Sequence, residues 1–206
     1  MNVKYNANKH RGRHIFRFYS KKAGTTIKVE SFLEYCYACI FECDPQISSF
    51  ASQVETMHIE NPLLEKISAK TPDFLVEYIN GSSEYIEVHS STKVDDKYQA
   101  TIQKFSDYSQ SLGEPEIRIV TEVGLSPIVR VNYQLIASCK SLELSFSIDD
   151  CDFAELTTFN DLIESLSEIS NSSVEEAYYL LSSGFYQFDI SSLLEGDTLL
   201  TRVKTW

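Results

Sequence analysis

Two acidic residues and a histidine fall near the ends of two neighbouring predicted β-strands. Asp73 begins one apolar segment, and Glu87 and His89 end the next one along the chain. Between them lies Asn80-Gly81, a dipeptide that is a strong signal for a hairpin turn. Pairing of the two strands should therefore bring the carboxylates of Asp73 and Glu87 close together. Because side chains alternate along a strand, Glu87 and His89 should share one face while Val88 points into the core.

These residue types suit metal-dependent hydrolysis of a phosphodiester. Carboxylate oxygens are the ligands that Mg²⁺ and Mn²⁺ prefer in proteins. A metal held by Asp73 and Glu87 can activate water and neutralise charge on a phosphate, and His89 beside them can transfer a proton or orient the phosphate. Pro-Asp and Glu-x-His are also common on the solvent face of an ordinary hairpin. The pattern alone therefore does not establish a nuclease.

Apolar periodicity and turn residues predict the elements around this hairpin. Helices are predicted over residues 29–44, 95–112 and 132–139. Extended segments are predicted over residues 46–60, 71–79, 84–89 and 116–121. Asp44-Pro45 should end the first helix and Gly113 the second. The order of helices and strands predicts an α/β domain over residues 29–145, built on a mixed sheet flanked by helices.

The C-terminal residues differ in character from this domain. A polar stretch over residues 145–151 is followed by predicted helices over residues 158–169 and 172–183. Ser172 and Glu175 have the spacing of a capping box, and Gly184 should end the second of these helices. Short apolar strands are predicted over residues 185–190 and 199–203. Two helices followed by a β pair predict a small winged-helix-like module over residues 153–206.

Charge is distributed unevenly along the chain. The net charge is −12, yet residues 1–30 carry eight Lys or Arg against one Glu, a net +7 that leaves −19 for the remainder. We expect a basic N-terminal arm over residues 1–28 that contacts DNA phosphates or a partner, and the alternative is a solvated leader. The candidate DNA-binding residues are Lys9, Arg11, Arg13, Arg17, Lys21 and Lys22 in this arm, with Gln53 and Lys93 outside it.

Composition also bears on the compartment. The five cysteines are an odd number without a framework spacing, which favours reduced thiols in a cytoplasmic protein. If the chain binds DNA, we expect it to associate with the bacterial nucleoid while bound. The sequence contains no apolar run of about 18 residues, so we expect no membrane span. The polar, basic N-terminus is not typical of a secretory signal.

Four stretches, in the same order and with similar spacing, resemble the TnsA-type endonuclease subunit of heteromeric cut-and-paste transposases. The resemblance covers roughly residues 10–140. The stretches are Tyr19–Lys22 with Glu30–Glu34, Phe41–Ile47, Thr71–Val76 with Ile86–Val88, and Ile119–Glu122 with Asn132.

The resemblance implies a restriction-endonuclease-like fold and a metal-dependent cut of the 5′ strands at transposon ends. A separate transposase subunit would cut the 3′ ends. By position, Glu34, Asp73 and Glu87 correspond to the ligands of Mg²⁺, for which Mn²⁺ can substitute. Family members also carry a C-terminal winged-helix-like domain that engages an ATPase regulator, and residues 153–206 correspond to it.

His89 departs from the family pattern, which has lysine at this position. Lysine is a permanent cation, whereas histidine is mostly neutral at pH 7. The histidine could replace lysine with a steeper pH dependence, act as a metal ligand, or mark a weakened site, and Lys93 or Lys70 could reach in instead. Three functions stay open. The first is a transposase endonuclease subunit, the second a weakly active or inactive scaffold that docks the transposase and its ATPase regulator, and the third a stand-alone restriction or repair nuclease.

Overall fold

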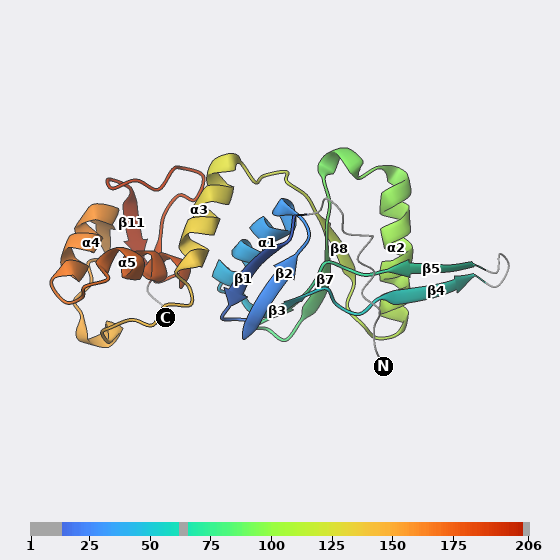
Figure 1. Ribbon diagram of the computed structural model, residues 1–206, viewed down its shortest axis with the longest axis horizontal. Coiled ribbons are helices and arrows are strands. Elements are labelled where there is room, and N and C mark those ends of the chain that lie inside the picture. The colour runs from blue at the N-terminus through green and yellow to red at the C-terminus, as the bar shows by residue number, and fades with distance from the viewer. Residues whose placement is uncertain (1–13, 62–65, 204–206) are drawn as a thin grey trace.

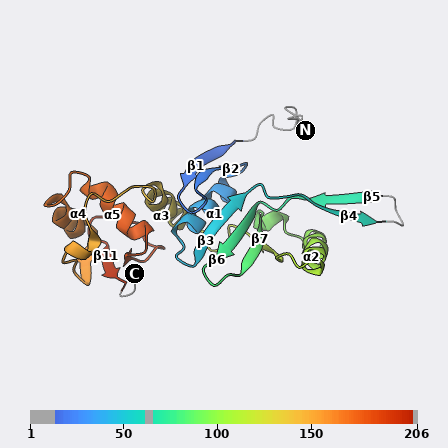
Figure 2. The same ribbon diagram turned by 90° about the horizontal axis from the view of Figure 1, so that it is seen from below.

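The computed structural model describes residues 14–61 and 66–203, and its elements form an elongated molecule (Figure 1). A central α/β body lies between a C-terminal module and a projecting β-hairpin, an arrangement that is also visible in the second view (Figure 2). None of the described helices is both long and apolar enough to cross a lipid bilayer.

The central body is built on a four-stranded sheet in the order β3-β6-β7-β8. The strands are β3 (Ile47–Ser52), β6 (Phe74–Tyr78), β7 (Ser83–Val88) and β8 (Ile117–Val120). The first three pair antiparallel, and β8 lies parallel to β7. The predicted turn is confirmed: Gly81 has φ of 83°, and the Tyr78 N–H donates to the Ser82 carbonyl at 2.9 Å.

One helix covers each face of this sheet. Helix α1 (Phe32–Cys43) packs Phe41 against Phe50, Phe74 and Ile86 on one face. Helix α2 (Asp96–Ser111) packs Ile102 and Phe105 against Ile117 on the other face. The mixed sheet flanked by helices that the sequence predicts is confirmed, and it fits a restriction-endonuclease-like fold.

Both helices end where the sequence predicts. At the start of α1, the Ser31 hydroxyl accepts a hydrogen bond from the Glu34 N–H at 3.1 Å, and the helix ends at Asp44. At the start of α2, Asp95 accepts from the Tyr98 N–H at 2.7 Å. Gly113 follows α2 with φ of 78°, a conformation that glycine adopts without strain.

The N-terminal arm expected over residues 1–28 is a packed β-hairpin from residue 16 onward. Strands β1 (Phe16–Ser20) and β2 (Thr25–Val29) pair antiparallel. Residues 1–13 lie outside the described residues. Ile27 and Val29 are 2% exposed and belong to the core, because apolar side chains alternate along both strands. The basic residues of this hairpin, Arg17, Lys21, Lys22 and Lys28, therefore belong to a folded element.

A second hairpin divides the segment predicted to be extended over residues 46–60. After β3, the chain turns through Gln53–Thr56 and enters β4 (Met57–Asn61), which pairs with β5 (Lys66–Lys70). The sequence did not predict β5. This β4–β5 hairpin projects beside α2 in both views (Figures 1 and 2), and Met57 at its base packs against the core that α2 covers.

The C-terminal module combines two helices with a three-stranded sheet in the order β10-β11-β9. Its elements are β9 (Leu156–Thr158), α4 (Phe159–Ser167), α5 (Ser173–Ser182), β10 (Tyr186–Gln187) and β11 (Leu199–Arg202). Strand β9 was not predicted, and β10 has only two of the residues expected over 185–190. The predicted capping box is wrong. Ser172 has φ of −119° and ψ of 34° rather than an extended backbone, and its side chain caps nothing in α5.

Helix α3 (Pro127–Ser138) joins the central body to the C-terminal module. It is longer than predicted because Ser126 caps it and Pro127 occupies its first turn. It lies between α1 and α5 (Figure 2), and its Asn132 is 1% exposed. The Asn132 amide donates to the carbonyls of Ile190 and Ser192 at 3.0 and 2.7 Å. Asn132 therefore fixes the loop between β10 and β11 to α3.

We expect Asn132→Ala to destabilise the protein by about 2–3 kcal/mol, because it removes a buried side chain together with its two hydrogen bonds to the Ile190 and Ser192 carbonyls. The free energy of urea-induced unfolding measures this loss. Val131→Ala is the matched control, since Val131 is 51% exposed on the same helix. A loss no larger than that of the control would contradict the bridging role of Asn132.

Candidate metal centre

An open cleft of about 810 Å³ lies where the start of α1 meets the start of β6 and the end of β7. It brings together residues that are far apart in the sequence, from the N-terminal hairpin to the loop after β7. Its lining includes the acidic residues Glu30, Glu34, Asp73 and Glu87 and the basic residues Lys28, His89 and Lys93.

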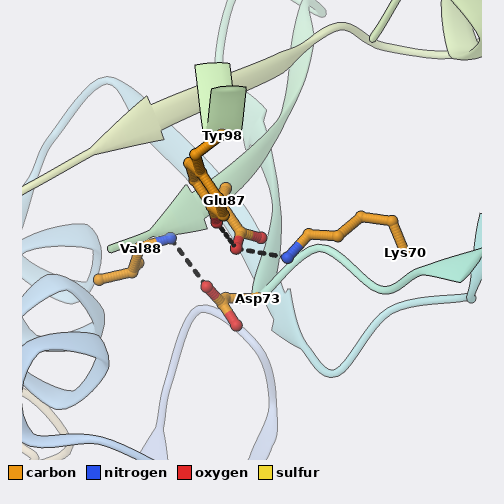
Figure 3. A network of polar contacts seen from close by, with 5 residues as sticks. All are labelled: Lys70, Asp73, Glu87, Val88 and Tyr98. Atoms are coloured by element: carbon orange, nitrogen blue, oxygen red, sulfur yellow. Dashed lines mark hydrogen bonds and ion pairs between the residues drawn. The ribbon is translucent and has the colours of Figure 1, made fainter. Parts of the chain in front are cut away.

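Hydrogen bonds to the backbone N–H, the backbone carbonyl and the side chain of Asp73 hold this residue in place. Its N–H donates to the Ile86 carbonyl at 3.0 Å, and its own carbonyl accepts from the Gln53 N–H at 3.1 Å. Its carboxylate accepts from the Val88 N–H at 2.8 Å (Figure 3). Burial, followed by the negative charge of Glu87, raises the pKa of Asp73 to about 7. The carboxylate is thus fixed in a position that disfavours its charge when no cation is present.

Glu87 lies beside Asp73 and is 3% exposed. One carboxylate oxygen, Oε1, accepts from the Lys70 ammonium and from the Tyr98 hydroxyl, the latter at 2.5 Å (Figure 3). The other oxygen, Oε2, is buried and accepts no hydrogen bond from any described residue. A buried carboxylate oxygen without a donor is costly, and a cation would remove that cost.

A divalent cation fits this pair of carboxylates. Glu87 Oε2 has no partner among the described residues, and burial and the charge of Glu87 raise the pKa of Asp73, so both carboxylates would be stabilised by a bound cation. Among the described residues, no three His, Cys, Asp or Glu side chains form a ready ligand set. Mg²⁺ commonly takes one or two carboxylates and completes its shell with water and phosphate, so two suffice.

Glu34 lies in the same cleft but is engaged at the start of α1. Its side chain accepts from the Glu30 N–H at 2.9 Å, while its own N–H donates to Ser31. This reciprocal pattern is close to a capping box and fixes the side chain at the helix N-terminus. Its charge still contributes to the raised pKa of Asp73, after burial and the charge of Glu87. Glu34 is therefore a neighbour of the acidic pair.

His89 lines the cleft, and its ring is stacked on Tyr98 with ring centroids 4.2 Å apart and planes 9° from parallel. Its N–H donates to the Val120 carbonyl at 2.9 Å, which continues the β7–β8 pairing. Val88, between Glu87 and His89, is buried in the opposite core, so the predicted orientation of Val88 is confirmed. The His89 ring thus lies against the phenol that donates to Glu87.

The candidate DNA-binding residues separate into three groups. Lys9, Arg11 and Arg13 lie outside the described residues. Gln53 and Lys93 line the cleft, and Gln53 has φ of 55°, an uncommon conformation for a residue other than glycine and one that concentrates at functional sites.

The third group, Arg17, Lys21 and Lys22, belongs to the N-terminal hairpin and does not line the cleft. The Lys22 ammonium donates to the carbonyls of Phe41 and Asp44 at the end of α1. The Lys21 ammonium lies 5.6 Å from the centre of the Tyr179 ring. These contacts join the hairpin to α1 and α5.

Sequence reasoning missed three residues that shape the cleft. Lys28 on β2 lines it, although the sequence groups Lys28 with the arm. Tyr98 on α2 donates its hydroxyl to Glu87, and the predicted helix over residues 95–112 gave it no role at the site. Glu122 holds the loop after β7 by accepting from Ser91 N–H and hydroxyl groups, and these bonds lower the pKa of Glu122 to about 2.

Asp73→Asn should stabilise the metal-free protein at pH 8 by about 2–4 kcal/mol, because the variant removes a charge that folding disfavours. The folded pKa of Asp73, about 7, is above its value in the unfolded chain. The stability given by the protonated carboxyl is therefore present below about pH 4 and is lost as the pH rises through 7. Urea unfolding in a chelator from pH 4 to pH 8 measures this, and a gain that does not change with pH would contradict it.

Comparison with known proteins identifies the segment that carries the acidic pair. No curated protein matches the chain. The family model for the TnsA-like endonuclease N-terminal domain matches residues 44–112. The match runs from the end of α1 through the β6–β7 hairpin and α2, so it contains Asp73, Glu87 and His89 but not Glu34. The resemblance found in the sequence is therefore confirmed over this segment, where residues 44–112 match the model of the TnsA-like endonuclease N-terminal domain.

Proposed function

We propose that this chain is a metal-dependent DNA endonuclease subunit of a transposase that cuts the 5′ strands at transposon ends. The observation that carries the proposal is the Asp73–Glu87 pair, which hydrogen bonds hold in an open cleft and in which one buried carboxylate oxygen has no partner among the described residues. The family match over residues 44–112 supports the reaction class. A separate transposase subunit would supply the 3′ cuts.

In this proposal, Asp73 and Glu87 hold Mg²⁺, with Mn²⁺ as a substitute, and Glu34 adds a third negative charge. The bound metal supplies an activated water and neutralises charge on the phosphate. The chain fixes Asp73 through the Val88 N–H and fixes Glu87 through Tyr98, so the ligands are oriented before a metal arrives.

Substrate DNA would be held by donors around the mouth of the cleft. Lys28, Lys93 and Gln53 are exposed there and can donate to backbone phosphates. The Ser90–Lys93 loop is ordered by Glu122, which presents its hydroxyl groups at a fixed place. Such contacts set the register of the DNA but do not select its sequence.

The C-terminal module would be a winged-helix-like domain that docks the ATPase regulator. The order α3-β9-α4-α5-β10-β11, with β11 between β10 and β9, supports this assignment. Residues 153–206 carry nine Asp or Glu against two Lys or Arg. A surface of this charge repels DNA and is better suited to a protein partner.

Reconstitution with the transposase subunit on end-labelled donor DNA tests the function, in Mg²⁺ and in Mn²⁺. We expect wild type to nick the 5′ strand and Asp73→Ala to leave it intact while the complex still assembles. An assembled wild-type complex that makes no 5′ nick with either metal would favour the scaffold. Nicking by the chain without the transposase would favour a stand-alone nuclease.

A further inference from the structure

We propose that Lys70 is the phosphate-binding ammonium of this site, and that it pairs with Glu87 only while no metal is bound. The inference rests on the function proposed above. It assigns the positive charge of the site to a residue on β5, a strand that belongs to a different hairpin from the acidic pair.

Lys70 lies beside the acidic pair and contacts Glu87. Its ammonium contacts Glu87 Oε1, and the two side chains are 23% and 4% exposed (Figure 3). Lys70 stands at the base of the β4–β5 hairpin and is followed directly by Thr71, which lines the cleft. It approaches Glu87 from beside the cleft, so its flexible stem can turn toward the cleft without moving the strand.

A bound metal and the Lys70 ammonium would compete for the charge of Glu87. Oε1 already accepts two donors, from Lys70 and Tyr98, whereas Oε2 accepts none from the described residues. A divalent cation on the Asp73–Glu87 pair would neutralise the charge that holds the ammonium and would repel it. The ammonium would then be free for a phosphate, to which lysine binds as a compact charge.

The other basic residues of the site, His89, Lys28 and Lys93, make different contacts from Lys70. The His89 ring is stacked on Tyr98, which itself donates to Glu87. Lys28 and Lys93 line the cleft as exposed side chains, and the contact with the acidic pair comes from Lys70. We therefore assign His89 to positioning Tyr98, and Lys70 to the substrate phosphate.

Lys70→Met separates this role from a purely structural one, because metal binding and cleavage should change in opposite directions. Mn²⁺ affinity, measured by electron paramagnetic resonance, should rise about tenfold because a competing charge-assisted hydrogen bond is lost. Nicking in the transposase complex at saturating metal should fall by about 100-fold or more. Lys70→Arg, which keeps the charge, should retain most of the nicking.

Two controls separate these effects from a general change in charge. Lys93→Met removes a cation from the same cleft, and its Mn²⁺ affinity should rise less than that of Lys70→Met. Lys104→Met removes a charge from an exposed position on α2, and its nicking should match wild type. A rescue is also expected: adding His89→Lys to Lys70→Met should restore nicking, because residue 89 lies on the same strand face as Glu87.

Three results would overturn the assignment. Unchanged or weaker Mn²⁺ binding by Lys70→Met would mean that the ammonium supports the metal site rather than competing for it. Tighter binding with undiminished nicking would leave Lys70 as a counter-ion without a role on phosphate. The third result is tighter Mn²⁺ binding by Lys70→Met together with a wild-type complex that never nicks DNA. It would overturn the proposed function and the phosphate role of Lys70, although the titration would still show that Lys70 and the metal compete for Glu87.

Discussion

Glu87→Gln is expected to lower the rate of 5′-strand nicking by about 10³-fold or more. The substitution keeps the shape of the side chain but removes the negative charge that would hold the metal. Since Glu87 is 3% exposed and fixed by Tyr98, no neighbouring carboxylate can move into its place without rearrangement. Strand-resolved gels of the reconstituted complex measure the rate.

Glu84→Gln is the matched control for this variant. Glu84 lies on the same strand, β7, but it does not line the cleft. Its carboxylate forms an ion pair with Arg118, with a distance of 2.6 Å between Arg118 Nε and Glu84 Oε2. We expect nicking by Glu84→Gln to equal that of wild type, because a partly exposed ion pair contributes little even to stability. Equal rates for Glu87→Gln and wild type would remove Glu87 from the metal site.

Phe74→Ala is expected to destabilise the protein by about 3–5 kcal/mol, a large part of the stability of an ordinary domain. Phe74 is 0% exposed and lies edge to face with Phe41 at 5.3 Å and close to Phe50 at 6.3 Å. The same side chain anchors the strand that begins immediately after Asp73, so a cavity here would also loosen the acidic pair. The free energy of urea-induced unfolding measures the loss.

Ile79→Ala provides the comparison, since Ile79 is 63% exposed at the other end of the same hairpin. This change should alter the unfolding free energy by less than about 0.5 kcal/mol. A loss below about 1 kcal/mol for Phe74→Ala would mean that the aromatic cluster is not the main support of β6.

The hairpin that carries the acidic pair could be predicted because its signals are local. Asn80-Gly81 marks the position of the turn, although the loop holds three residues, Ile79, Asn80 and Gly81, and this length aligns Phe74 with Ile86. The same holds for α1 and α2, whose first residues are capped by Ser31 and Asp95. Local signals thus predict the elements and the approach of Asp73 to Glu87.

The surroundings of Glu87 could not be predicted because they depend on contacts between distant segments. Lys70 reaches Glu87 only because β5 pairs with β4, and Tyr98 reaches it only because α2 packs on the second face of the sheet. Neither contact follows from spacing in the sequence. His89 was expected to act on substrate, yet its stacking on Tyr98 depends on the same packing.

The N-terminal β1–β2 hairpin was not predicted because its many basic residues are typical of a solvated arm. The dense Lys and Arg residues favoured a solvated arm, although Phe16 and Phe18 alternate with polar residues and pack on Tyr35. In the C-terminal module, β9 and β10 have three and two residues, too few for a clear period-two pattern. Short strands of this kind are defined by their pairing with β11 rather than by their own sequence.

Anomalous diffraction at the manganese edge, from crystals soaked in Mn²⁺, tests the metal centre most directly. We expect one peak in contact with carboxylate oxygens of Asp73 and Glu87, with the Lys70 ammonium no longer on Glu87. The peak should be absent from Asp73→Asn crystals treated in the same way. A peak at another place, or wild-type crystals in which Lys70 stays on Glu87 and no metal binds at saturating Mn²⁺, would contradict the account of this cleft as a metal-dependent nuclease site.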